Sequence, residues 1–460
     1  MFLIQPWHWR SLPLNQRSGS DVFMRLFLTD EIATLLESPY PPSPDYPQLG
    51  RYSICAGSPR VVNGEVQLWT PPTGEILPFL QQLLDRPRPE AVPDSLPFTG
   101  GWLGWLGYDL AWEIERLPYL KSDGLPFPVA YWYEPDCFAV LDHQQQILWL
   151  AATEKDRLHQ MNDRLTNHPK FAGSVPSEAS SARFYLSESA YASAVLQAQK
   201  HIQAGDIFQA NLSLRFEAKT TAESWSIYGA LQQINPSPFA SYWKTPWGDV
   251  ISCSPERLVK LQDRYAETRP IAGTRPRGQT QEYDRQLAEE LISNIKEQAE
   301  HIMLVDLERN DLGRVCEWGS VIVDELLAIE RYSHVMHLVS NIIGTLKPEF
   351  NAVDLIRALF PGGTITGCPK VRCMEIIETL EPFRRSLFYG SCGYLDWRGN
   401  LDLNILIRTL LYVPEAKGAI VYGQVGAGIV ADSDPTREWH ESLHKAQAQL
   451  AALKLAQSWI

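Results

Sequence analysis

Two pairs of glutamates have a spacing that could hold a metal ion. Glu297 and Glu300 are three residues apart in a helical pattern, and Glu438 and Glu441 repeat that spacing near the other end of the chain. Residues three apart on a helix share one face. Such pairs are often only solvated helix faces, but Glu300 precedes the apolar run 301–305, where an unpaired carboxylate is costly. If the two pairs met, their oxygens would suit Mg²⁺, which takes few carboxylates and keeps several waters.

Two glycine-bearing segments and one arginine could bind an anion. Segment 360–367 precedes an amphipathic pattern, and segment 426–428 follows a strand-like run. Each could offer backbone N–H groups to a carboxylate, or could be an ordinary tight turn. Arg408 lies inside the apolar run 405–410. A buried arginine needs an anionic partner, which is here either a protein carboxylate or a ligand.

The overall composition excludes several classes of protein. Of the 460 residues, 45% are hydrophobic and 21% are charged, so the chain can bury a large core and does not resemble a disordered or fibrous protein. The 41 Lys and Arg residues against 54 Asp and Glu residues give a net charge of −13. This charge argues against nucleic acid as a partner, because proteins that bind phosphate backbones need a basic surface.

The cysteines and the hydropathy indicate a cytoplasmic protein. The chain has seven cysteines, which are scattered and form no CxxC pair, as is typical of reduced thiols. No segment approaches the roughly 18 apolar residues of a membrane span, and no signal peptide is evident. We therefore expect no membrane partner.

Three regions supply the elements that must position these residues. Residues 1–165 are rich in Pro and Trp, residues 166–184 have the small residues of a linker, and residues 185–450 carry most of the helical periodicity. The mixture of patterns indicates an architecture of both helices and strands. Helices are predicted over 187–204 and 279–305, and strands over 130–133, 146–151, 250–252, 258–261, 390–395 and 420–422.

Four segments together resemble the chorismate-utilising enzyme family. They are GDIFQ (205–209), PIAGTRPRG (270–278), DLERNDLGR (306–314) and FPGGTITGCPK (360–370), and the resemblance extends over residues 30–450. Four motifs of this length in the family's order are very unlikely by chance. The family contains the large subunits of anthranilate synthase and aminodeoxychorismate synthase. The resemblance implies an α+β fold, a four-layer α/β/β/α sandwich in which the sheets are shared between the N-terminal and the catalytic regions, and Mg²⁺-dependent amination of chorismate.

The resemblance also implies roles for individual residues. Glu300 and Glu441 match the magnesium ligands, Glu297 and Glu438 match outer carboxylates, and Glu256 matches the general acid that protonates the departing C4 hydroxyl. The other catalytic positions are Gln209, Ala272, Thr274 and His337. The positions that match substrate contacts are Thr364, Tyr389, Arg408, Gly426, Ala427, Gly428 and Lys445, of which Tyr389 and Arg408 match the pair that grips the enolpyruvyl carboxylate.

Several of these residues, taken singly, have a plain structural alternative. His337 could be a core histidine, Tyr389 could serve packing, and Glu256 could be half of a surface ion pair. Their joint occurrence in the family's order favours the functional interpretation.

Gln209 bears on the identity of the nucleophile. Members of the family that add water have a lysine base at this position, and an amide cannot deprotonate water. The resemblance therefore implies ammonia as the nucleophile. Because the chain has no glutamine amidotransferase motif, the ammonia must come from solution or from a separate small subunit.

The product depends on finer features. Ala272 is typical of anthranilate synthases, whereas many aminodeoxychorismate synthases have a lysine there. Segments 211–213 and 363–366 and the compact N-terminal region resemble the folate branch. We therefore expect 4-amino-4-deoxychorismate, with anthranilate as the alternative.

A further set of residues resembles the family's tryptophan pocket. This pocket gives feedback inhibition in the anthranilate branch, and in the aminodeoxychorismate branch it can have a structural role only. A non-catalytic, tryptophan-binding regulatory subunit is therefore a third alternative, although the intact Glu256, Glu300 and Glu441 argue against it. The residues of this set are Leu36, Glu37, Ser38, Arg51, Tyr52, Pro236 and Ser237.

Overall fold

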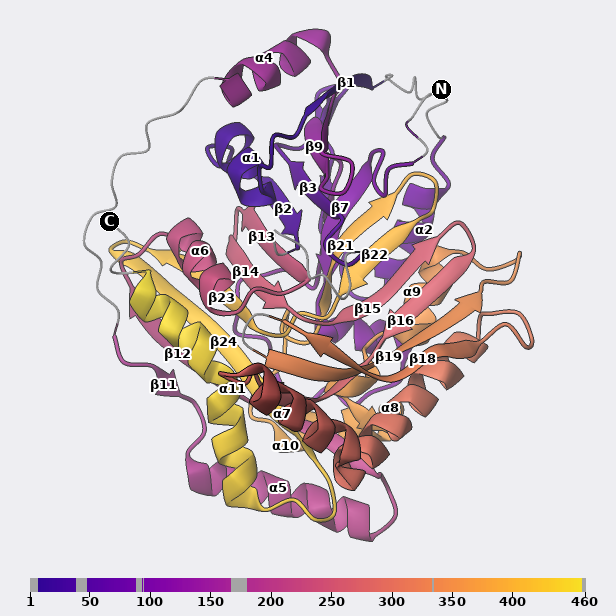
Figure 1. The fold of residues 1–460 in the computed structure, drawn as a ribbon, viewed down its shortest axis with the longest axis vertical. Coiled ribbons are helices and arrows are strands. Elements are labelled where there is room, and N and C mark those ends of the chain that lie inside the picture. The colour runs from indigo at the N-terminus through magenta and orange to yellow at the C-terminus, as the bar shows by residue number, and fades with distance from the viewer. Residues whose placement is uncertain are drawn as a thin grey trace.

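Two large antiparallel sheets make up most of the structure (Figure 1). The computed structural model describes residues 7–38, 48–87, 93, 95–166, 180–332 and 335–456. The first sheet has 12 strands. In spatial order they are β1 (His8–Pro13), β10 (Ile147–Ala152), β9 (Cys137–Asp142), β3 (Tyr52–Ala56), β2 (Ala33–Glu37), β13 (Phe239–Thr245), β14 (Gly248–Ser254), β23 (Thr409–Glu415), β24 (Gly418–Ile429), β12 (Gln209–Thr220) and β11 (Arg183–Phe184), with β20 (Gly367–Cys368) also paired to β12.

The second sheet has 10 strands. Both sheets combine strands that precede residue 166 with strands that follow residue 180, so neither half of the chain could form its sheet alone. In spatial order the strands are β17 (Ile271–Pro276), β19 (Val335–Thr345), β16 (Tyr265–Arg269), β15 (Arg257–Gln262), β22 (Leu401–Asn404), β21 (Ser391–Asp396), β7 (Gly101–Leu106), β8 (Ala130–Tyr133) and β6 (Leu68–Trp69), with β18 (Ile322–Arg331) paired to β19; β4 (Val61–Val62) and β5 (Glu65–Val66) form a separate pair.

The two sheets pack face to face around an aromatic core. Trp105 of β7 and Trp243 of β13 come from different sheets, and their ring centroids are 6.0 Å apart. In β14, Val250 belongs to this shared core, whereas its neighbour Ile251 packs on the opposite side of the sheet. Because successive strand residues alternate between faces, one strand can contribute to both cores. The predicted α+β fold with two packed sheets is confirmed.

Helices cover the outer faces of both sheets (Figure 1). Against the first sheet pack α1 (Gly19–Leu26), α4 (Lys155–Thr166), α5 (Glu188–Gln203), α6 (Ser224–Ile234), α10 (Lys370–Leu380) and α11 (Pro435–Leu455). On the side of the second sheet lie α2 (Ile76–Leu84), α7 (Gln281–Ser293), α8 (Ile295–Gly313) and α9 (Ala352–Leu359); α3 (Ala111–Ile114) and two 3-10 turns, Tyr108–Leu110 and Gly363–Ile365, are short.

One predicted helix is correct and the other is wrong. The helix expected over 187–204 is α5, which Ser187 caps by accepting a hydrogen bond from Ala190 N. The single helix expected over 279–305 is instead two helices that break at Asn294, whose backbone is extended (φ −73°, ψ 107°). The Asn294 side chain accepts a hydrogen bond from Glu297 N, so this residue ends α7 and caps α8. Of the expected linker 166–184, residues 167–179 lie outside the described residues.

Candidate active site

Glu256 is a buried carboxyl group directly before β15. Its exposed fraction is 4%, and burial raises its pKa to about 7. Among the described residues no cation lies within ion-pair distance of this carboxylate, whose Oε1 accepts a long hydrogen bond from Ile271 N (3.4 Å) and whose pKa is lowered slightly by the Thr364 side chain. The surface ion pair considered from the sequence is therefore not formed. A carboxyl group that keeps its proton near neutral pH has the property that a general acid needs.

Gln209, Glu300 and Gly428 meet where β12, α8 and β24 come together. Gln209 Nε2 donates to Glu300 Oε1 over 2.9 Å. A Cβ atom at Gly428 would lie 2.3 Å from Gln209 Nε2 and 3.2 Å from Glu300 Oε1. Gly428 lies within β24 and not in a tight turn, and the lack of a side chain at this position lets the Gln209 amide approach the strand this closely.

The four glutamates of the expected metal site are held by four different partners. Glu300 is bound by Gln209, and Glu297 Oε1 accepts from Arg275 Nη1 (3.2 Å). The partners in α11 are Ser433, which donates to Glu438 Oε1 (2.7 Å), and Lys445, whose Nζ lies 2.8 Å from Glu441 Oε1. Among the described residues no three acidic, His or Cys side chains are close enough together to hold a metal ion.

Glu300 and Glu441 are nevertheless influenced by the same two lysines. Burial and then the charge of Glu297 raise the pKa of Glu300, while Lys445 and Lys296 lower it. The same two lysines act on Glu441, where they outweigh the effect of burial and lower the pKa. Glu300 is thus a half-buried carboxylate beside a like charge, which a divalent cation would stabilise. The hard oxygen donors of the two pairs fit Mg²⁺.

Tyr389 and Arg408 share an uncommon backbone conformation. Their φ angles are 66° and 52°, in the left-handed region that non-glycine residues rarely adopt. Residues held in this region cluster at functional sites. Arg408 Nη1 donates to Lys445 O (2.9 Å), and no carboxylate of the described chain pairs with this guanidinium. The sequence left either a protein carboxylate or a ligand as the anionic partner of Arg408. Because no carboxylate of the described chain pairs with it, the structure favours a ligand.

His337 and Thr274 face each other across β17 and β19. Thr274 Oγ1 lies 2.9 Å from His337 Nδ1, and the two residues are opposite each other in the strand register. Burial, together with the charge of Arg408, lowers the pKa of His337 to about 4, so the imidazole is neutral at physiological pH. Ala272 is on the same strand as Thr274, is nearly buried, and lies opposite Leu338.

Lys445 and Asn211 lie beside two glycines of β24. Lys445 Nζ donates to Gly426 O (3.0 Å), and Asn211 lies opposite Gly428 in the β12–β24 register. Two buried acceptors, Gln209 Oε1 and Asn211 Oδ1, have no hydrogen-bond partner among the described residues. Unsatisfied buried polar atoms are costly, so these oxygens are suited to bind a ligand.

Arg385, for which no role was expected, contacts two residues of this site, Asn211 and Tyr389. It is fully buried, donates to Ile365 O and Asn211 O (both 2.7 Å), and its guanidinium lies 4.6 Å from the centre of the Tyr389 ring. Glu381 balances its charge at 2.7 Å. A pair of arginines in the sequence gives no sign of burial, so only the fold reveals this contact.

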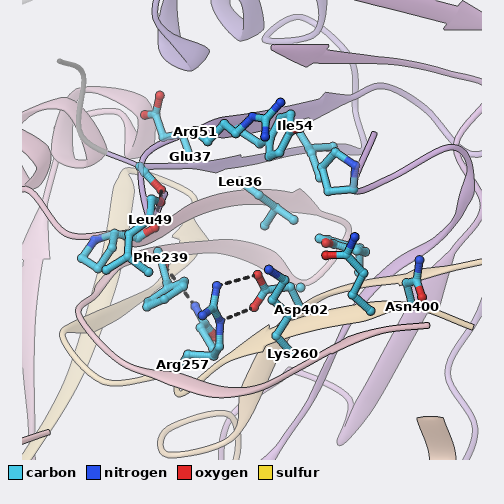
Figure 2. Close-up of a pocket in the computed structure, with 18 of the residues that line it drawn as sticks. Leu36, Glu37, Leu49, Arg51, Ile54, Phe239, Arg257, Lys260, Asn400 and Asp402 are labelled. Atoms are coloured by element: carbon cyan, nitrogen blue, oxygen red, sulfur yellow. Dashed lines mark hydrogen bonds and ion pairs between the residues drawn. The ribbon is translucent and has the colours of Figure 1, made fainter. Parts of the chain in front are cut away.

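A cavity of about 310 Å³ lies between the two sheets, apart from the residues described above (Figure 2). Five of the residues named for the tryptophan-type pocket line it, namely Leu36, Glu37, Ser38, Arg51 and Tyr52. Pro236 and Ser237 do not line it; their neighbours Pro238 and Phe239 do.

The Glu37 carboxylate is already engaged by residues of two helices. Its carboxylate accepts hydrogen bonds from Ser20 N (2.9 Å), Ser20 Oγ (2.6 Å), Tyr228 Oη (2.7 Å) and Gln232 Nε2 (3.0 Å). Burial raises the pKa of Glu37. The side chain therefore ties α1 and α6 together and has little capacity left for a ligand.

Comparison with known proteins identifies the family. Residues 45–451 match the family model described as chorismate binding enzyme. The chain is 62% identical to an anthranilate synthase component I-like protein of Synechocystis, over 98% of this chain and 93% of that protein. It is 42% identical to aminodeoxychorismate synthase component 1 of Bacillus subtilis, over 97% of both chains.

Solved structures share the fold. Anthranilate synthase component I from Streptococcus pneumoniae superimposes with a TM-score of 0.75 and 31% identity, over 87% of this chain and 92% of that chain. The menaquinone-specific isochorismate synthase of Escherichia coli has a TM-score of 0.73 at 18% identity, over 98% and 95% of the two chains, which shows the common fold alone. Within the described part of the chain, no helix has the length and apolar character to cross a membrane.

Proposed function

Because this chain belongs to the chorismate binding enzyme family and is a chorismate-utilising enzyme, we propose that it aminates chorismate to 4-amino-4-deoxychorismate. The proposal that ammonia is the nucleophile rests on the presence of Gln209, whose amide donates a hydrogen bond to Glu300. The resemblance places a lysine base here in members that add water. An amide has no basic lone pair at neutral pH, so it can orient a neutral nucleophile but cannot activate water.

We assign separate roles in substrate binding and proton transfer to the residues of the site. Arg408 and Tyr389 hold the enolpyruvyl carboxylate, and Glu256 gives its proton to the C4 hydroxyl, which leaves as water. In the net reaction the C4–O bond breaks, a C4–N bond forms, and the added ammonia loses one proton. Mg²⁺, held by Glu300 and Glu441 with Glu297 and Glu438 around them, would offset the charge of the ring carboxylate. Neutral His337, oriented by Thr274, borders the ring without adding a charge.

The relatives support the choice of product. The chain is 62% identical to the anthranilate synthase component I-like protein of Synechocystis but 39% identical to the anthranilate synthase component 1 of the same organism. Synechocystis therefore has two distinct relatives of this chain. The more similar of the two is the one named anthranilate synthase component I-like, not the one named anthranilate synthase component 1. The 42% identity to aminodeoxychorismate synthase component 1 of Bacillus subtilis extends over almost the full chain and supports the same choice.

Anthranilate synthesis is the second candidate, and a specific residue favours it. Ala272 is the residue that the resemblance associates with anthranilate synthases. Anthranilate synthase component 1 of Thermus thermophilus is 45% identical, over 80% of each chain. In either case alanine has no nucleophile, so no protein-linked adduct forms at this position.

The proposal includes two partners. The relatives are named as component I or 1, which supports a separate glutamine amidotransferase subunit as the source of ammonia. The cavity between the two sheets would take tryptophan, because apolar and charged side chains line it together.

The products of purified protein with chorismate, ammonium and Mg²⁺ test the proposal. Addition of a lyase that releases 4-aminobenzoate should convert the product to 4-aminobenzoate. Fluorescent anthranilate formed without the lyase would overturn the choice of product in favour of the second candidate.

A further inference from the structure

Helix α8 carries a second buried carboxyl group, Glu308, to which the proposed function gives no role. Its exposed fraction is 6%, and within the described part of the chain no cation forms an ion pair with it. The charge of Lys370 acts on Glu308, but this lysine is paired with Asp311 at 2.7 Å. A buried carboxylate without a cation is costly, so these surroundings favour the neutral form of Glu308.

The hydrogen bonds of Thr268 indicate the same form of Glu308. The buried Thr268 Oγ1 lies 2.9 Å from Leu258 O and 2.5 Å from Glu308 Oε2. A hydroxyl group has one proton, and a backbone carbonyl can only accept. If Thr268 donates to Leu258 O, the short contact with Glu308 needs a proton from the carboxyl group. Both contacts are therefore satisfied only when Glu308 is a carboxylic acid that donates to Thr268.

The carbonyl that Thr268 holds lies where β15 departs from regular pairing. The register of β15 with β16 shifts between Arg257 and Lys260, and its register with β22 shifts within the same segment. Irregular pairing of this kind bends a strand and re-aims its side chains. Glu256 lies two residues before Leu258. The bond from Thr268 to Leu258 O therefore helps to fix the direction of the Glu256 side chain.

The same helix supports a loop that contacts Glu256. A Cβ atom at Gly363 would lie 2.5 Å from Leu307 Cδ2, so this loop packs closely on the residue before Glu308. Thr364 follows Gly363, and its side chain acts on the pKa of Glu256, which it lowers against the effect of burial. The strand and the loop around Glu256 thus both contact α8, the strand through Glu308 and the loop through Leu307.

Ionisation of Glu308 would disturb this arrangement in two ways. The charged groups that face it are Glu256, Asp311 and Lys370. Burial, and then the charges of Glu256 and Asp311, raise the pKa of Glu308 to about 8, while Lys370 lowers it. A carboxylate formed above this pH would draw the Thr268 proton away from the β15 carbonyl, and it would place a second negative charge near Glu256. The two carboxyl groups therefore titrate as a pair.

We propose that Glu308 is a positioning residue for Glu256. As a neutral acid it donates to Thr268 and leaves the Thr268 proton for the irregular segment of β15, and once Glu308 is ionised this segment is released. The inference rests on the proposed function, because it takes Glu256 as the general acid. Its effect falls on kcat more than on KM, since the proton of the acid is needed only in the transition state.

Steady-state kinetics of Thr268→Val and Thr268→Ser test the positioning role. Valine keeps the shape but lacks the hydroxyl group, and we expect kcat to fall about tenfold or more with KM within about twofold, because small displacements of a catalytic group are costly. Serine keeps the hydroxyl group and should keep kcat within about twofold of the wild type. Thermal melts show whether each variant is folded.

The variant Glu308→Gln tests the protonation state in the absence of chorismate. At about pH 6, the infrared difference spectrum between the wild type and this variant should show the carbonyl stretch of a protonated carboxyl group. Asp306→Asn is the matched control and should show no such band, because Asp306 is an exposed acid of the same helix that pairs with Arg309 at 2.9 Å. It should also keep the wild-type kcat.

The stability of Glu308→Gln gives a second measure of the buried proton. A carboxyl group whose pKa rises from 4.5 to about 8 on folding loses its proton more readily in the unfolded state. The unfolding constant of the wild type, divided by that of the variant, should therefore rise by about tenfold for each pH unit between these values. Urea denaturation over this pH range measures the ratio.

The pH dependence of kcat, at a constant concentration of free ammonia, connects protonation with catalysis. Above about pH 8 the wild-type kcat should fall more steeply than tenfold per pH unit, because both carboxyl groups must be protonated, whereas in Glu308→Gln it should fall about tenfold. This slope decides the question if Thr268→Val does not fold.

Three results would overturn the inference: a difference spectrum without the carboxyl band, wild-type kcat in folded Thr268→Val, or equal slopes in the wild type and Glu308→Gln. Full activity of Glu256→Gln would instead overturn the assignment of the acid in the proposed function. The infrared band would still report the proton on Glu308 in that case, because its measurement needs no turnover.

Discussion

Replacement of Glu256 by Gln should lower turnover strongly without harming the fold. The variant has nearly the same shape but no acidic proton, so kcat should fall by about 10²-fold or more, the usual contribution of a positioned general acid. KM should change little, because proton donation is needed only in the transition state. Initial rates over a range of chorismate concentrations separate the two parameters.

The pKa of Glu256 sets the pH dependence of the wild type. With a pKa of about 7, the protonated and active form dominates below pH 7 and falls about tenfold for each pH unit well above it. The rate should therefore decline on the alkaline side with an apparent pKa near 7. The residual rate of Glu256→Gln should not show this alkaline decline.

The same pKa makes a stability prediction of definite sign. A carboxyl group whose pKa is raised from 4.5 to about 7 on folding is ionised more readily in the unfolded state, so stability is lost as the pH rises between these values. The shift corresponds to a cost of about 3 kcal/mol above pH 7. Glu256→Gln should thus be at least as stable as the wild type at pH 8, as urea denaturation would show. An active variant, or an inactive one that is also unfolded, would refute the reasoning.

Four further variants test the rest of the site. In Glu300→Gln and Glu441→Gln the Mg²⁺ concentration for half-maximal rate should rise about 10-fold to 100-fold, because one anionic ligand is lost; unchanged Mg²⁺ titrations would contradict the metal assignment. Gly428→Ala should remove most activity, because its Cβ would clash with Gln209 at 2.3 Å, and wild-type rates would show that this contact is unimportant. Ala272→Lys should still yield 4-amino-4-deoxychorismate by chromatography, whereas loss of an anthranilate product would indicate C2 amination in the wild type.

Local patterns in the sequence predicted the elements well. The strand expected over 130–133 is β8 itself, and α5 covers the helix expected over 187–204, with Ser187 as its cap. The break at Asn294 was missed because the apolar stripe continues through it, while the asparagine side chain competes for the backbone.

Contacts between distant segments could not be predicted in the same way. The bond from Gln209 to Glu300 joins residues 91 positions apart, and that from Arg385 to Asn211 joins residues 174 apart. The resemblance placed Gln209 and Glu300 at the site because it carries information on the fold. It gave no role to Arg385 and assigned Glu37 to the pocket, although the carboxylate is used by Ser20, Tyr228 and Gln232.

The stoichiometry of pyruvate tests the central claim most directly. 4-Amino-4-deoxychorismate keeps the enolpyruvyl ether of chorismate, whereas anthranilate formation releases it as pyruvate. With wild-type protein, chorismate, ammonium and Mg²⁺, lactate dehydrogenase and NADH would report pyruvate while chorismate consumption is followed by chromatography. We predict that chorismate is consumed with almost no pyruvate until a lyase is added. Release of one pyruvate for each chorismate without the lyase would contradict the claim.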